Sequence, residues 1–175
     1  FTLKSAQTNI EAGAEITFGN TVSIESGLGA SLALTTSNTG SITANKDVGS
    51  DDLRLDRLHI VDTGSATFNG SVYIKSLTTE ALPYDVRFKG EKTFVTDFTE
   101  IKNTGVVQLG SQILMSDTQS SDAIVTSELR FENGLKAVSQ SHLNMAGTVK
   151  TFGHDMVLGS GETQFTLLQN LTLNA

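Results

Sequence analysis

Three aspartates and an arginine, Asp51, Asp52, Asp56 and Arg54, form the densest group of charged side chains in this sequence. Oxygen-rich loops of this kind bind Ca²⁺, and carboxylates that face one another across a groove act as acid and base in polysaccharide lyases and hydrolases. The cluster is therefore the first candidate for a metal or catalytic site. It lies in a charged segment, residues 46–59, within an otherwise more neutral chain.

Alternating leucines offer a simpler interpretation of the same cluster. Leu53 and Leu55 predict a strand whose solvent side carries the aspartates and Arg54. Arg54 and Arg57 are close enough in sequence to neutralise the acids. The apolar spacing changes between Leu55 and Leu58, which predicts a bulge or a corner there. We therefore interpret the cluster as a solvated charged surface, and we predict no catalytic, cofactor-binding or metal-binding residue.

Other catalytic and metal-binding patterns point the same way. The chain has no cysteine, and its three histidines, His59, His142 and His154, form no His-Glu-x-x-His motif. It contains no Gly-Gly pair, which excludes the nonapeptide Ca²⁺-binding repeat, and no Gly-x-Ser-x-Gly nucleophile motif. We expect no cofactor.

Two tyrosines are candidates for contact with a carbohydrate. Tyr73 falls on an outward position of an alternating run, and Tyr84 follows the single proline, Pro83, in an expected loop. Ordinary packing is the competing interpretation for both. Asn69-Gly70-Ser71 also matches a glycosylation sequon, a pattern that arises by chance in a chain rich in Ser, Thr and Asn.

Net charge excludes two classes of partner. The chain of 175 residues carries a net charge of -7, whereas nucleic-acid binding and electrostatic attachment to a membrane surface both need a cationic patch. No apolar run approaches the ~20 residues of a membrane-spanning helix. We therefore expect neither a nucleic-acid partner nor membrane insertion.

Short alternating runs closed by Gly, Asn or Asp predict an all-β fold. Each run lasts about five residues, and its large side chains fall on alternate positions, so that one side is buried. One segment, residues 134–143, has an alternative helical spacing. The predicted strands are 14–18, 21–25, 31–35, 71–75, 84–88 and 166–173.

One local unit recurs along the chain: Thr-Phe, followed four residues after the Phe by another apolar side chain. Such reuse of a unit is typical of repeat architectures, in which neighbouring coils bury each other's apolar faces. The four copies are Thr17-Phe18 with Val22, Thr67-Phe68 with Val72, Thr93-Phe94 with Phe98, and Thr151-Phe152 with Met156.

Two architectures fit these strands. An antiparallel β-sandwich, with Asn69-Gly70 as a hairpin turn, is the runner-up. A right-handed parallel β-helix, or β-solenoid, better explains the near absence of proline and the Gly or Asn at the corners. With about 20–25 residues per coil, the chain would hold about seven to nine coils.

Several segments resemble the β-strand repeats of filamentous-haemagglutinin-like bacterial surface proteins, across residues 10 to 173. Their vocabulary appears in residues 16–22, 32–35 and 40–43. It appears most clearly in Ala66-Thr67-Phe68-Asn69-Gly70-Ser71-Val72 followed by Ser76-Leu77-Thr78-Thr79. The resemblance implies a right-handed parallel β-helix in a secreted or cell-surface protein linked to adhesion or biofilm, and it brings no site residues with it.

The functional expectation follows from this resemblance and from the missing chemistry. We expect residues 1–175 to be a single solenoid segment cut from a longer chain, acting as a non-catalytic stalk or contact surface. Its partner would be a host-cell, matrix or biofilm surface component, including carbohydrate, and the segment could associate end to end or laterally. The alternatives are a carbohydrate-active β-helix enzyme and a trimeric fibre module.

Overall fold

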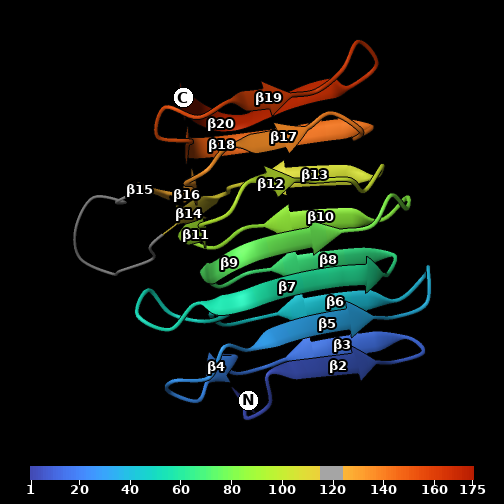
Figure 1. Ribbon diagram of the computed structural model, residues 1–175. Coiled ribbons are helices and arrows are strands. Elements are labelled where there is room, and N and C mark those ends of the chain that lie inside the picture. Colours follow the sequence, from blue (N-terminus) through green and yellow to red (C-terminus); the bar gives the residue numbers. More distant parts are fainter. Residues whose placement is uncertain (115–123) are drawn as a thin grey trace.

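The fold is a parallel β-solenoid. The computed structural model describes residues 1–114 and 124–175, and every regular element in these residues is a β-strand (Figure 1). Successive turns of the chain lie one above another, with the N-terminus at one end of the stack and the C-terminus at the other. The runner-up sandwich is therefore wrong, because the stacked strands pair in parallel.

Each coil contributes to three faces, which we call A, B and C in the order in which the chain reaches them after β2. Face A is the most regular, with seven strands in one parallel ladder. They are β3 (Glu15–Phe18), β6 (Ser41–Ala44), β8 (Ser65–Phe68), β10 (Asp85–Phe88), β13 (Val106–Leu109) and the first parts of β18 (His142–Lys150) and β20 (Gln164–Asn174).

Faces B and C complete each coil, and β9, β18 and β20 each run around a corner from one face to the next, as does β7 after its first residue, Leu55, which pairs with Ile74 on face B. Face B consists of β1 (Thr2–Leu3), β4 (Ser23–Ile24), the first part of β9 (Val72–Thr79), β11 (Lys92–Val95), β16 (Glu128–Phe131) and the last parts of β18 and β20. Face C consists of β2 (Gln7–Glu11), β5 (Ser31–Thr35), β7 (Leu55–Asp62), the last part of β9, β12 (Thr99–Glu100), β17 (Leu135–Ala137) and β19 (Met156–Leu158).

Alternating side chains fill the interior of the stack. Ile42 is in register with Ala66, which is in register with Val86, and all three are fully buried. The rings of Phe68 and Phe88, also in register, stack with their centroids 5.3 Å apart. Every second side chain of a strand points inward, and the parallel register places the inward residues of successive coils above one another. These residues therefore form a continuous apolar column.

The recurring Thr-Phe unit is confirmed as a core element in two of its four copies. Phe18 and Phe68 occupy equivalent inward positions on face A, and both are buried together with the valines four residues later, Val22 and Val72. These two copies mark the corner between faces A and B.

The other two copies are not core elements. Thr93 takes the inward position, so Phe94 lies on the outer side of face B, in register with Tyr73 and Arg130, where it is nevertheless only 4% exposed. Phe98 is exposed. Likewise Thr151 is buried, whereas Phe152 lies in an exposed turn with a φ of 54°. Inward threonines reverse the side on which the following phenylalanine lies.

The structure excludes two local alternatives and corrects one prediction, the start of the strand in the charged segment. Residues 134–143 form β17 and the start of β18 rather than a helix. Asn69-Gly70 makes a corner between β8 and β9 rather than a hairpin. The strand of the charged segment begins at Leu55, and Leu53 lies in the preceding bend, where its N–H is held by Ser50.

The expected corner near Asp56 and Arg57 is confirmed. Both residues lie between the buried Leu55 and Leu58, so two successive side chains are not in the core. β9 changes phase at the equivalent place while the pairing of the two strands stays in register.

Coil length is nearly constant except at one insertion. Partners on face A are 26 residues apart for Glu15 and Ser41, 20 for Ser65 and Asp85, and 36 for Val106 and His142. The long step contains the antiparallel pair β14 (Gln112–Leu114) and β15 (Ile124–Thr126). At its base Ser111 N–H donates to Ser127 Oγ at 2.9 Å, so the coil closes beneath the insertion.

Deleting residues 112–126 should leave the solenoid folded. Gly110, Ser111 and Ser127 would then join Leu109 to Glu128. In the neighbouring coil, three residues likewise join Phe88 to Lys92, which are the register partners of Leu109 and Glu128. We expect the far-ultraviolet circular dichroism to remain that of a β-protein and the Tm to change by less than about 5 °C, roughly 1–2 kcal/mol for a chain of this size. Loss of cooperative unfolding would show that the insertion is part of the core.

Candidate binding site

The predicted charged cluster does not converge on one site. Asp51 binds Arg54 at 3.0 Å, whereas Asp56 Oδ1 lies 2.5 Å from Lys75 Nζ, and Asp52 is exposed. The aspartates are thus divided between two cations and solvent. The expected neutralisation by Arg54 holds for Asp51, and a lysine of the next coil takes that role for Asp56.

Arg54 connects coils that are distant in sequence. Its Nη2 donates to Asp51, and its Nη1 donates to Thr96 Oγ1 at 2.8 Å and to Glu132 Oε1 at 3.3 Å. Burial lowers the pKa of Arg54, but the hydrogen bonds to Asp51 and Glu132 outweigh that effect, and the net pKa is raised. The arginine therefore ties the bend before β7 to the coils of β11 and β16, which lie two and three coils away from it.

Tyr73 lies on the outer side of face B, as predicted. Its ring makes an edge contact with Phe94, with 5.5 Å between centroids, and the guanidinium of Arg130 lies 4.6 Å from the Phe94 centroid on the same surface. Tyr73 is partly exposed.

Tyr84 is not a surface residue, and its prediction as a sugar contact is wrong. Only 1% of the residue is exposed. Its hydroxyl donates to Ile60 O at 2.9 Å and accepts from Glu80 N–H at 2.7 Å, so it bridges the bend at residues 81–83 to the preceding coil. The position next to a bend was predicted correctly, but residues 81–83 stay exposed while the Tyr84 side chain after them is buried in the core.

The same burial raises the pKa of Tyr84 to about 12. We expect Tyr84→Phe to lower the free energy of unfolding at pH 7 by about 1–3 kcal/mol, because it leaves a buried donor and a buried acceptor unpaired. Urea titration with circular dichroism measures this change.

Alkaline pH offers a second readout. The protonated phenol of Tyr84 stabilises the fold fully below about pH 10, the pKa of a tyrosine in the unfolded chain. This contribution is lost as pH rises toward about 12, the pKa in the folded protein. Wild type should lose on the order of 2–3 kcal/mol more than Tyr84→Phe between these pH values. Equal losses in both proteins would contradict the proposed role of the phenol.

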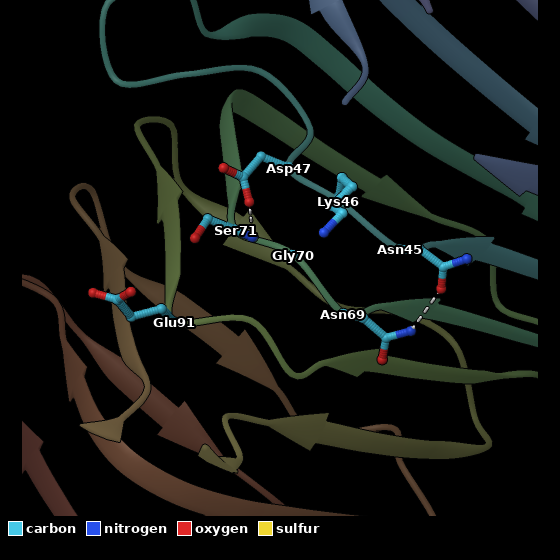
Figure 2. A pocket seen from close by; sticks show the side chains of 7 residues that line it. All are labelled: Asn45, Lys46, Asp47, Asn69, Gly70, Ser71 and Glu91. Carbon is cyan, nitrogen blue, oxygen red and sulfur yellow. Dashed lines mark hydrogen bonds between the residues drawn. The ribbon is translucent and has the colours of Figure 1, made fainter. Parts of the chain in front are cut away.

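A surface depression lies at the corner between faces A and B. It has a volume of about 330 Å³ and is lined by Asn45, Lys46, Asp47, Asn69, Gly70, Ser71 and Glu91, from three successive coils (Figure 2). None of the residues predicted as a site lines it, although Tyr73 is only two residues beyond Ser71.

Hydrogen bonds between coils fix the walls of this depression. Asn69 Nδ2 donates to Asn45 Oδ1 at 3.2 Å, and Ser71 N–H donates to Asp47 Oδ1 at 2.7 Å. Ser71 Oγ in turn accepts from Lys92 N–H at 3.3 Å. Figure 2 shows the two amides at one end and the carboxylates of Asp47 and Glu91 at the other.

Glycine at position 70 allows the coils to approach at this corner. A Cβ there would lie 2.3 Å from the carbonyl carbon of Lys46 and 2.5 Å from the nitrogen of Asp47. Since both are backbone atoms, no side-chain rotation relieves the contact.

Gly70→Ala should therefore destabilise the protein by about 1–3 kcal/mol through overpacking. Gly19 is a matched control on the same corner of the first coil, where a Cβ meets nothing within 4 Å. Gly19→Ala should stay within about 1 kcal/mol of wild type. Similar stabilities of the two variants in urea titration would show that close coil contact at Gly70 is unimportant.

The structure distributes the histidines over separate places. His59 lies on face C with Nε2 2.7 Å from Glu80 Oε1, His142 begins the face A part of β18, and His154 lies in the turn after it. Within residues 1–114 and 124–175, no group of three or more His, Cys, Asp or Glu could hold a metal ion.

Sequence reasoning missed the depression because its walls are 24 residues apart. Asn69-Gly70-Ser71 was visible as a sequon, and Lys46-Asp47 as the start of the charged segment. Only the register between β6 and β8 brings the two together.

Comparison of the chain with protein-family models, curated proteins and solved structures finds no match. In the part of the chain that the structure describes, no helix is long and apolar enough to cross a membrane.

Proposed function

We propose that this chain is a non-catalytic, rigid segment of a large secreted or cell-surface bacterial protein, where it serves as a stalk and contact surface. The observation that carries the proposal is the in-register stack of seven strands on face A over one continuous core. Such a stack extends in one direction and displays side chains of many coils on flat outer faces. The resemblance to filamentous-haemagglutinin-like repeats supports the same role.

The enzyme alternative needs two carboxylates that face one another across a groove at a separation of about 5–10 Å. Asp51 and Asp56 are each bound to a different cation instead. No observation on the cluster favours a lyase or hydrolase, and we do not propose one.

Self-association through an open edge must be separated from adhesion to another surface. In the 175-residue segment tested by itself, β20 exposes Phe165, Leu167 and Leu173, whose partners in β18 are buried. Unpaired backbone groups and exposed apolar side chains make such an edge a template for another strand. Leu167→Lys places a charge on this edge and should weaken end-to-end association.

Adhesion of protein-coated beads tests the proposed contact function. Beads that carry the Leu167→Lys protein should be retained on at least one of three surfaces: cultured epithelial cells, extracellular matrix or a bacterial biofilm. Retention should exceed that of albumin-coated beads at least about tenfold, as expected for many weak contacts acting together. Retention equal to albumin on all three surfaces would overturn the proposal.

Analytical ultracentrifugation of the same variant distinguishes the trimeric-fibre alternative. A solenoid that closes its core within one chain should sediment as a monomer. A stable trimer would favour the fibre module.

A further inference from the structure

The depression at the corner of faces A and B presents donors and acceptors side by side. The hydrogen bond between the two amides uses Asn45 Oδ1 and one proton of Asn69, which leaves Asn45 Nδ2 as a donor and Asn69 Oδ1 as an acceptor. Asp47 likewise uses Oδ1 for Ser71 N–H and keeps Oδ2 for a ligand. Lys46 and Glu91 add one ammonium and one carboxylate to the lining.

Alternating donors and acceptors suit a ligand whose groups do both. A sugar hydroxyl donates one hydrogen bond and accepts others, whereas a phosphate or sulfate only accepts. The lining carries one ammonium and two carboxylates, so its net charge is negative and opposes an anionic ligand. These two facts favour a neutral saccharide.

Tyr73 extends the site along the same strand. Ser71 forms part of the wall, and Tyr73 lies two residues further, about 6.6 Å along an extended chain. That distance is close to the length of one sugar unit. The T-shaped contact with Phe94 holds the Tyr73 ring in place, and a ring held in this way provides an apolar platform beside a hydrogen-bonding depression.

We propose that this depression and Tyr73 together bind a neutral oligosaccharide, with one sugar unit hydrogen-bonded in the depression and the next packed on the tyrosine ring. The inference rests on the proposed contact function and names the class of ligand at one place on the surface. The site is prearranged, because its polar groups are fixed by hydrogen bonds between coils and not by the ligand.

A divalent cation is the competing occupant, since carboxylate and amide oxygens also bind Ca²⁺. The lining contains only two carboxylates, and one oxygen of Asp47 is already occupied by Ser71 N–H. The saccharide therefore fits the donor set better, and the cation becomes an outcome of the test.

Amide chemical-shift titration of the whole chain tests the proposal. The probes are mono- and tetrasaccharides of glucose, galactose, mannose and N-acetylglucosamine, with sialylated and sulfated oligosaccharides as comparators. At least one neutral tetrasaccharide should shift the resonances of residues 45–47 and 69–73 and saturate with a Kd in the range of about 0.1–10 mM, corresponding to roughly 3–5 kcal/mol.

Three variants separate the two parts of the site. Asp47→Asn keeps an acceptor for Ser71 N–H, and Glu91→Gln changes only an exposed carboxylate, so both should preserve the fold and raise the Kd about fivefold or more through loss of a charge-assisted hydrogen bond. Tyr73→Leu should weaken the tetrasaccharide but leave the monosaccharide unchanged. Glu25→Gln, an exposed carboxylate outside the depression, is the matched control and should bind like wild type.

Several results would overturn the inference: no saturable neutral saccharide, binding unaffected by Asp47→Asn and Glu91→Gln, or preference for the anionic comparators. Binding that requires Ca²⁺ and is abolished by a chelator would assign the depression to a cation instead. Retention of coated beads without saccharide binding would leave the contact function standing and reject only this site. Saccharide binding without bead retention would reject the contact function alone.

Discussion

Parallel hydrogen bonding between successive coils determines where nearly every side chain of this protein lies. A strand on face A is placed by the strand below it, so Ile42, Ala66 and Val86 form a column even though the sequence between them differs in length. A shift of one residue would turn each inward side chain to solvent. The register is therefore specified by the apolar residues themselves, and the core is closed only when every coil pairs with its neighbour in this register.

The same register creates the polar features of the surface. Asn45 meets Asn69, and Arg54 meets Thr96 and Glu132, because equivalent corners lie above one another. Inside the stack, Asn103 Nδ2 donates to Tyr84 O at 2.8 Å, and Gln140 Nε2 donates to Asn103 O at 2.9 Å. These amides satisfy carbonyls at corners where the strand ladder is interrupted, which explains polar side chains at core depth.

Sequence patterns predicted the fold class well because the alternation of apolar residues and the turn residues that follow it indicate the same strands within each coil. The runs at 31–35 and 84–88 became strands nearly as predicted, since alternation and turn residues act over a few positions. Sequence patterns could not predict the side on which Phe94 lies, the burial of Tyr84 or the residues that line the depression. Each depends on which residue of another coil stands in register, and coil steps of 20 to 36 residues hide that correspondence.

The orientation of the hydrogen bonds between coils also determines the mechanical response of the protein. These bonds run along the stacking axis, so tension applied between the two ends pulls on one coil at a time rather than shearing a whole sheet. A coil of 20 residues, such as the one from Ser65 to Asp85, would release roughly 65–70 Å of chain when it detaches. A tether built this way lengthens in steps and dissipates energy at each step, while the remaining coils keep their structure.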